Sequence, residues 1–147
     1  GEYLHACVNG GADGIEIGIP FSDPLADGPV IQASSQKALE KGVTLLDAFS
    51  LAQKVTSVPV YFMTYLNPVY RYGAERFLSR SKKSGISGLI IPDLPPEEAG
   101  TVLPKAPLIF LCSPTCTEKR IAKIARASHE WIYLVALPVR PNLRRSA

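Results

Sequence analysis

The sequence predicts an α/β fold in which helices cover a parallel sheet. Short apolar runs alternate along the chain with longer stretches of helical period, which is the order of βα units. The runs are apolar almost throughout, as in strands that are buried on both faces. Five of them are expected to form consecutive strands, entered from the tail of a preceding helix: Ile15–Ile19, Val60–Tyr65, Gly88–Asp93, Leu108–Ser113 and Trp131–Leu137.

The stretches between these runs carry the start and stop signals of helices. Thr44 and Thr117 are in N-cap positions, and Asp47 has the charge that suits a helix start. Gly42 and Gly85 are where C-terminal glycines belong. The expected helices are Tyr3–Val8, Val30–Lys41, Leu45–Val55, Ala74–Ser84, Glu97–Leu103 and Glu118–Ala127.

Composition indicates one ordinary domain and argues against several classes of function. The chain has 147 residues, of which 46% are hydrophobic and 20% charged, enough apolar mass for a core. The net charge is +3 and the basic residues are scattered except at the end, so neither nucleic acid nor a membrane surface is expected as a partner. No apolar stretch has the length of a membrane span.

The three cysteines, Cys7, Cys112 and Cys116, are an odd count with no signal peptide before them. This pattern fits a reducing, cytoplasmic setting. Because no second cysteine pair or nearby histidine completes a tetrahedral site, no metal is expected and all three are interpreted as packing residues.

A carboxylate stands within the first apolar run. In the alternation Ile15-Glu16-Ile17-Gly18-Ile19, the three isoleucines share one face and Glu16 shares the other with Gly18. Isoleucines suit the side covered by helices, which aims Glu16 inward. A buried, unpaired carboxylate costs several kcal/mol unless it stays protonated or gains a partner. A structural ion pair is one interpretation, but the other four runs offer no inward basic residue, and Gly18 leaves room for a ligand.

The loop Pro20–Pro29 leaves the carboxyl end of that run, where parallel α/β folds place their chemistry. Its three prolines exclude helix and stiffen the backbone. Asp27 precedes Gly28-Pro29, so it either caps the next helix or acts on a ligand, and spacing alone leaves both open. Asp23, before Pro24, is equally compatible with a routine turn.

Several blocks, in order, carry a family resemblance. "ADGIEIGIPFSDPLADGPVIQ", "PVYFMTYLNPVYRYG", "GLIIPDLPPEE", "IFLCSPTCTEKRIAKIA" and "WIYLV" resemble the tryptophan synthase alpha chain family, from about Leu4 to Val135. The resemblance implies a (β/α)₈ TIM barrel of which residues 1–137 form a partial domain, about strands 2 to 6. Residues 138–147 form an atypical tail rich in proline and arginine.

The resemblance also implies a reaction and its residues. The family cleaves indole-3-glycerol phosphate to indole and glyceraldehyde 3-phosphate, a retro-aldol step in tryptophan biosynthesis. Glu16 matches the acid–base residue, and Asp27 matches the partner of the indole nitrogen. Tyr65 and Tyr133 match tyrosines that line the site. The positions that wall the indole pocket are Ile31, Met63 and Ile90.

A partner is implied in the same way. The family assembles as a heterotetramer with a beta chain, which uses pyridoxal phosphate to join indole to serine, so no cofactor is expected in this chain. Positions matching the surface that meets the beta chain are Pro20, Asp23, Asn67 and Pro95.

The sequence departs from the family at both ends. The first strand and everything after the sixth are not found, including the glycine-rich loops that hold the substrate phosphate, and barrels of this kind need roughly 250 residues. The tail "PVRPNLRRSA" has no glycine and is interpreted as foreign or frame-shifted sequence, with its arginines solvated. We expect the chain alone to fold marginally, to self-associate through open sheet edges, and to have little lyase activity.

Three other functions remain as alternatives. A non-catalytic module that docks on a beta chain is disfavoured by the presence of both Glu16 and Asp27. A stand-alone indole-3-glycerol-phosphate lyase needs the same residues. Another phosphate-binding barrel enzyme is disfavoured by the loop "PFSDPLADGP".

Overall fold

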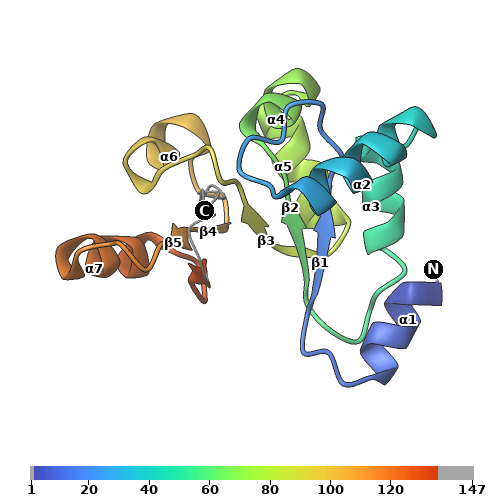
Figure 1. The fold of residues 1–147 in the computed structure, drawn as a ribbon, viewed down its shortest axis with the longest axis horizontal. Coiled ribbons are helices and arrows are strands. Elements are labelled where there is room, and N and C mark those ends of the chain that lie inside the picture. The colour runs from blue at the N-terminus through green and yellow to red at the C-terminus, as the bar shows by residue number, and fades with distance from the viewer. Residues whose placement is uncertain (1, 136–147) are drawn as a thin grey trace, which may run out of the picture.

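The structure, a computed structural model, describes residues 2–135 (Figure 1). The tail 138–147 and the last two residues of the fifth predicted strand lie outside the described residues. The helices are α1 (Glu2–Asn9), α2 (Pro29–Glu40), α3 (Leu45–Ala52), α4 (Leu66–Tyr72), α5 (Ala74–Lys83), α6 (Pro96–Val102) and α7 (Glu118–Ala127). The strands are β1 (Ile15–Gly18), β2 (Val60–Met63), β3 (Ile86–Ile90), β4 (Leu108–Ile109), β5 (Leu111–Cys112) and β6 (Tyr133–Leu134).

All the described strand pairs are parallel, as predicted. Strands β1 to β4 form one sheet in chain order, and β5 pairs with β6. The register places Met63 beside Gly18 on one side and beside Ile90 on the other. Within each sheet, every strand therefore neighbours the next strand along the chain, which is the order of strands in a barrel wall.

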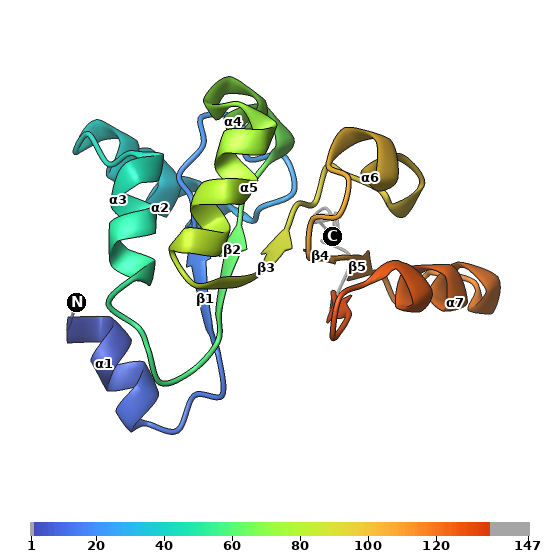
Figure 2. The same ribbon diagram turned by 180° about the vertical axis from the view of Figure 1, so that it is seen from behind.

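The two faces of the sheet have different neighbours. The larger core cluster lies on the outer face, where Ile15, Ile17 and Ile19 are buried together with Phe49 of α3 and Phe77 of α5. Figure 2 shows α5 in front of β1 and β2 on this side, with α3 next to it. The predicted helix-facing role of the three isoleucines is therefore confirmed.

The inner face carries a smaller core cluster, formed by Tyr61, Ile90 and Ile109, against which Trp131 and Tyr133 pack. The rings of Tyr61 and Trp131 meet edge to face, with centroids 5.2 Å apart. This cluster covers the β2 to β4 part of the inner face and leaves the β1 part open. The opening is where the candidate site lies.

Besides shifted bounds, such as β3 at Ile86–Ile90 where Gly88–Asp93 was predicted, two elements differ in kind from the sequence prediction. Helix α4 was not predicted; its Pro68 is the third helical residue, where the missing N–H has no partner to lose, so the proline does not interrupt the helix. The run Leu108–Ser113 is divided at Phe110, whose side chain is buried in the outer core. As a result β4 continues the first sheet and β5 starts the pairing with β6.

The predicted caps and C-terminal glycines are confirmed, although α3 ends at Ala52 and not at the predicted Val55. The Asp47 carboxylate accepts hydrogen bonds from the backbone N–H and the hydroxyl of Thr44, at 2.8 and 2.7 Å. The Thr117 hydroxyl accepts from the N–H of Arg120 at 3.3 Å. Gly42 and Gly85 have φ values of 75° and 76°, in the left-handed region that glycine adopts readily.

The cysteines differ from one another in burial. Cys112 is buried in the outer core and Cys116 packs against it, as expected of packing residues. Cys7 is exposed, so its predicted packing role is wrong. No buried residue is found in α1, which explains why a cysteine there faces solvent.

Candidate functional site

A cavity of about 450 Å³ opens where the chain leaves β1 and β2. Its size is that of a small-molecule site. It lies at the carboxyl ends of parallel strands, where a β-to-α loop brings polar residues over the sheet. The residues singled out in the sequence that line it are Glu16, Gly18, Pro20, Asp27, Ile31, Met63, Tyr65 and Tyr133.

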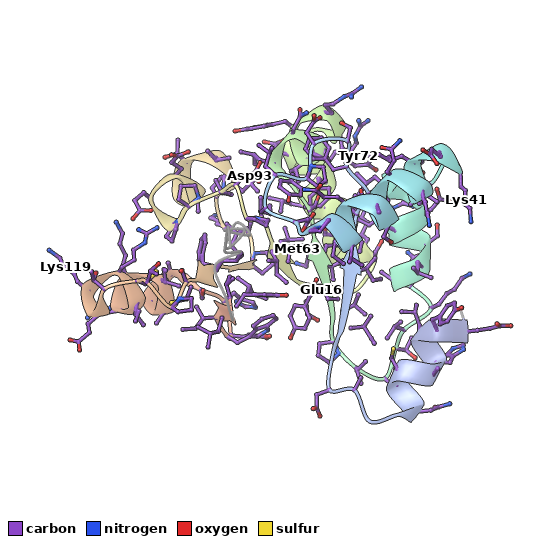
Figure 3. All side chains as sticks on the ribbon, viewed as in Figure 1. Glu16, Lys41, Met63, Tyr72, Asp93 and Lys119 are labelled. Carbon is purple, nitrogen blue, oxygen red and sulfur yellow. The ribbon has the colours of Figure 1, made fainter. Side chains whose placement is uncertain are left out.

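Glu16 projects into this cavity from the inner face of β1, near Met63 (Figure 3). The sequence predicted a buried carboxylate, but Glu16 is exposed, because the inner core cluster does not reach β1. Its surroundings still displace water: desolvation raises the pKa of Glu16, and the nearby Asp27 carboxylate raises it further. None of the ion pairs found among residues 2–135 includes Glu16, so nothing described supports a structural ion pair.

Asp27 reaches the same cavity from the loop after β1. Gly28 occupies the N-cap position of α2, and no side chain caps that helix, so the capping role left open by the sequence does not apply to Asp27. The backbone around it is bonded: the Asp27 N–H donates to the Pro24 carbonyl at 3.0 Å, and its carbonyl accepts from the Gln32 side-chain amide at 2.9 Å. The Asp27 carboxylate is therefore carried by a turn whose backbone is held by hydrogen bonds.

Tyr65 connects that loop to the next unit of the sheet. It immediately precedes α4, and its buried hydroxyl accepts a 2.9 Å hydrogen bond from the N–H of Ala26. Its ring lies 5.3 Å from that of Phe21. Desolvation raises the pKa of Tyr65, and the Asp27 and Asp93 carboxylates add to the rise against the opposing Ala26 bond. The hydroxyl is accordingly protonated at neutral pH.

Tyr133 closes the cavity from β6. The charge of Glu16 is the main cause that raises the pKa of Tyr133, followed by desolvation and by Asp27. Glu16 and Asp27, both from the first βα unit, therefore raise the pKa of a tyrosine in the last described strand. All three residues line the same cavity, so the fold brings together residues more than one hundred positions apart.

The three apolar positions expected to wall the cavity behave differently. Ile31, on α2, is 56% exposed and lines the opening, and Met63 lines it from β2. Ile90 is fully buried and is not among the lining residues, so the structure does not place it at the cavity surface. It lies beside Met63 in the register, behind the cover that Ile109 and Tyr133 provide.

The four positions expected to meet a partner lie in the connections that follow β1, β2 and β3. Asp23 and Asn67 are exposed, and Pro20 and Pro95 are partly exposed. The Asp23 carboxylate accepts from the Ser22 hydroxyl at 2.6 Å and its carbonyl accepts from the Leu25 N–H, so Asp23 also has the turn role considered for it. All four are thus found at the same edge of the sheet as the cavity mouth.

Sequence reasoning missed Asp93. Its carboxylate accepts the N–H of Leu66, the first residue of α4, at 3.0 and 3.2 Å. An aspartate set between prolines directly after an apolar run, in "IPDLPP", was the available signal.

The described residues show neither a metal-binding cluster nor a membrane-spanning helix. No group of three or more His, Cys, Asp or Glu side chains suited to a metal ion is found among them. None of the helices in residues 2–135 is long and apolar enough to span a bilayer.

Comparison with known proteins identifies the family. The model of the family described as tryptophan synthase alpha chain matches residues 1–138. The chain belongs to the tryptophan synthase alpha chain family. Among curated members of that family, the alpha chain of Methanosarcina mazei is 49% identical over 141 residues, and that of Burkholderia ambifaria is 42% identical over 145.

Solved structures share the fold. A structure from Aquifex aeolicus superposes with a TM-score of 0.86 at 40% identity over 95% of this chain, and the Legionella pneumophila subunit alpha with 0.83 at 38% over 93%. The tryptophan synthase complex from Pyrococcus furiosus gives 0.80 at 36% identity. These matches support the prediction that the parallel α/β fold is part of a TIM barrel.

The chain spans about half the length of the relatives that it matches. It covers 52% of the Methanosarcina mazei protein and 54% of the Burkholderia ambifaria protein. It covers 58% of the Aquifex aeolicus chain and 56% of the Legionella pneumophila chain.

Proposed function

We propose that this chain contributes the catalytic residues for cleaving indole-3-glycerol phosphate to indole and glyceraldehyde 3-phosphate. The observation that carries the proposal is that Glu16 and Asp27 line one cavity from a strand and from the loop that follows it. The cavity joins these two acids to the apolar side chains of Ile31 and Met63, a combination that suits a planar aromatic ring with one polar N–H.

Glu16 acts as the acid and then as the base. As a carboxylic acid it protonates C3 of the indole ring, which makes the ring a leaving group. The bond between C3 and the glycerol carbon then breaks, and its electron pair restores the aromatic ring. The hydroxyl on that carbon becomes the aldehyde as the Glu16 carboxylate takes its proton, so protons balance. A raised pKa suits a group that both gives and takes a proton near neutral pH.

Asp27 stabilises the positive charge that develops on the ring nitrogen when C3 is protonated. A carboxylate beside the ring N–H stabilises this charge most strongly in a water-poor site, where the carboxylate is already in place and need not reorient during the reaction. Tyr65 and Tyr133 line the cavity around both carboxylates, while Ile90 packs against Met63 from the adjacent strand.

The partner in this proposal is a beta chain, which holds the pyridoxal phosphate that joins indole to serine. The surface for it is formed by Pro20, Asp23, Asn67 and Pro95. The support is their common location in the connections after β1, β2 and β3, at the edge of the sheet where the cavity opens and where a released indole would leave the chain.

The experiment is indole release from indole-3-glycerol phosphate by the purified chain, with and without a beta chain. We expect slow release, well below that of a complete barrel, which is abolished in Glu16→Ala and reduced about 10²-fold or more in Asp27→Asn. The matched control is Asp13→Asn, which removes an exposed carboxyl in the turn before β1. Release that persists in Glu16→Ala would contradict the assigned roles.

A docking module without catalysis is the second candidate, favoured by the exposure of Asp23 and Asn67 at one edge. Its assay is the rate at which a beta chain joins indole to serine when the chain is added. Activation that survives in Glu16→Ala, in a chain that releases no indole, would select this candidate over the lyase.

A further inference from the structure

We propose that Asp93 is a positioning residue for Asp27, acting through α4 and the Tyr65 hydroxyl across three consecutive β-to-α connections. The inference rests on the proposed role of Asp27 in the lyase reaction. Its basis is a chain of hydrogen bonds that joins the loop after β3 to the start of α4, and the start of α4 to the loop after β1.

The first link fixes the start of α4. Both Asp93 carboxylate oxygens accept the N–H of Leu66, a residue 27 positions earlier. The first N–H groups of a helix have no partner inside the helix, and the residue at the N-cap of α4 is Tyr65, whose side chain makes no capping bond. Asp93 therefore supplies from another loop the cap that the local sequence lacks, and its charge strengthens the bond.

The second link fixes the Tyr65 side chain. The backbone on either side of Tyr65 is held, because the Thr64 N–H donates to the Ile90 carbonyl at 3.0 Å and Asp93 holds Leu66. The Tyr65 ring is buried and packs on Phe21, which leaves its hydroxyl one direction to point. The hydroxyl lies where the Ala26 N–H reaches it at 2.9 Å.

The third link reaches Asp27 through the peptide bond. Ala26 is its direct neighbour, so a fixed Ala26 N–H limits how far the backbone that carries the Asp27 carboxylate can move away from Glu16. Other side-chain bonds to the loop, between Ser35 and Phe21 and between Gln32 and Asp27, come from α2, the helix that this loop enters. Among the described residues, the Tyr65 hydroxyl provides the side-chain bond to this loop from the neighbouring βα unit.

The test measures amide hydrogen exchange by NMR in the full 147-residue chain. In Asp93→Ala we expect exchange at Leu66 and at Ala26 to accelerate together, each roughly fivefold, as for the loss of one net hydrogen bond. The Phe62 and Leu89 amides of the core strands report folding and are expected to stay protected. Accelerated exchange at Leu66 with none at Ala26 would overturn the proposal.

Asp47→Ala is the matched control. Asp47 caps α3 with a carboxylate just as Asp93 caps α4. The residue that Asp47 holds is Thr44, which is not a neighbour of Tyr65 and does not belong to the loop of Asp27. Its loss is expected to accelerate exchange at Thr44 and to leave Ala26 unchanged. If Ala26 responds equally to both variants, the effect is general destabilisation and the proposal fails.

A double-mutant cycle shows whether the effect passes through Tyr65. Tyr65→Phe alone is expected to accelerate exchange at the Ala26 amide and to leave the Leu66 amide protected. In that background Asp93→Ala should add nothing at Ala26, and an additional acceleration of similar size would overturn the proposed route. Should Asp93→Ala fail to fold, Asp93→Asn, which keeps one acceptor oxygen, is expected to give a smaller rise at both amides, and a rise at Leu66 alone would again overturn it.

These exchange rates do not depend on turnover. A chain that releases no indole fails the proposed function and still tests the link from Asp93 to Ala26. Conversely, a chain that releases indole but shows no coupling between Leu66 and Ala26 retains the proposed function and loses this inference.

Discussion

Gly88 of β3 lies opposite Tyr61 of β2 in the register of the sheet, and the missing side chain at Gly88 makes room for the Tyr61 ring. A Cβ atom at Gly88 would lie 2.7 Å from Cδ1 of Ile109 and 3.0 Å from Cδ1 of Tyr61. The inner core cluster, which supports Met63 and Tyr133 beside the cavity, therefore depends on a glycine at this point.

Replacing Gly88 with alanine is expected to lower the free energy of unfolding by about 1–3 kcal/mol, because the inner cluster must shift to accept the methyl group. Gly18→Ala is the matched control, since a Cβ there meets nothing within 4 Å. Urea denaturation of the two variants measures the difference. Equal destabilisation by both would contradict the close packing seen at Gly88.

Glu16 is expected to make stability depend on pH in a direction opposite to that of most carboxyls. Because its pKa is raised, the folded state holds the proton more tightly than the unfolded state does. This contribution is fully present below the ordinary pKa of about 4.5 and is lost as the pH rises through the raised value.

Glu16→Gln is therefore expected to be more stable than the unmodified chain at pH 7 and similar to it at pH 4. The gain stays below about 1 kcal/mol because the side chain is exposed and water screens its charge. Urea denaturation at both pH values measures it, with Asp13→Asn as the control for removing an exposed carboxyl. A Glu16→Gln variant that loses stability at pH 7 would rule out an unfavourable Glu16 charge.

Glu97 is expected to give the opposite pH dependence. It joins α6 to α7 through ion pairs with Lys123, at 2.7 Å, and with Arg120. The Lys123 ammonium and the Arg120 guanidinium lower the pKa of Glu97 from 4.5 to about 2. A lowered carboxyl pKa stabilises the fold above the unfolded value of 4.5, and this contribution is lost as the pH falls through about 2.

Unfolding curves between these pH values test the pair, comparing the unmodified chain with Glu97→Gln. The difference in stability is expected to shrink as the pH falls, and to shrink at high salt because all three side chains are solvent-accessible. Glu98→Gln, at the next and equally exposed position of α6, is the control. A pH-independent difference would show that packing, not charge, is lost.

The chain is expected to self-associate. Strand β1 pairs with β2 on one side, and no other described strand pairs with its second edge. Unpaired strand edges recruit other strands, and large apolar side chains are exposed elsewhere on the chain, including Leu25 and Val30 at 93% and 79%. Sedimentation velocity should show species above 15.9 kDa that increase with concentration. A single 15.9 kDa species that melts sharply would contradict this expectation.

The sequence by itself determined the order and type of most elements. Apolar runs and caps are local signals, so the parallel βα order, the isoleucine face of β1 and the glycines that end α2 and α5 were all predictable. Its family blocks also named Glu16, Asp27, Tyr65 and Tyr133, which the structure then places around one cavity. Helix α4 was not predictable, because it forms only if Pro68 falls within the first turn. The break at Phe110 was not predictable either, because it depends on whether the Phe110 side chain packs in the outer or the inner core.

Only the tertiary structure decided how these residues act on one another. Whether Glu16 is buried depends on how far the inner cluster extends, and whether Ile90 touches a ligand depends on what covers it. The cap that Asp93 supplies to α4 crosses 27 residues of sequence, and the bond from Ala26 to Tyr65 crosses 39. Such contacts arise only when parallel strands bring their carboxyl ends to one edge, which no local pattern records.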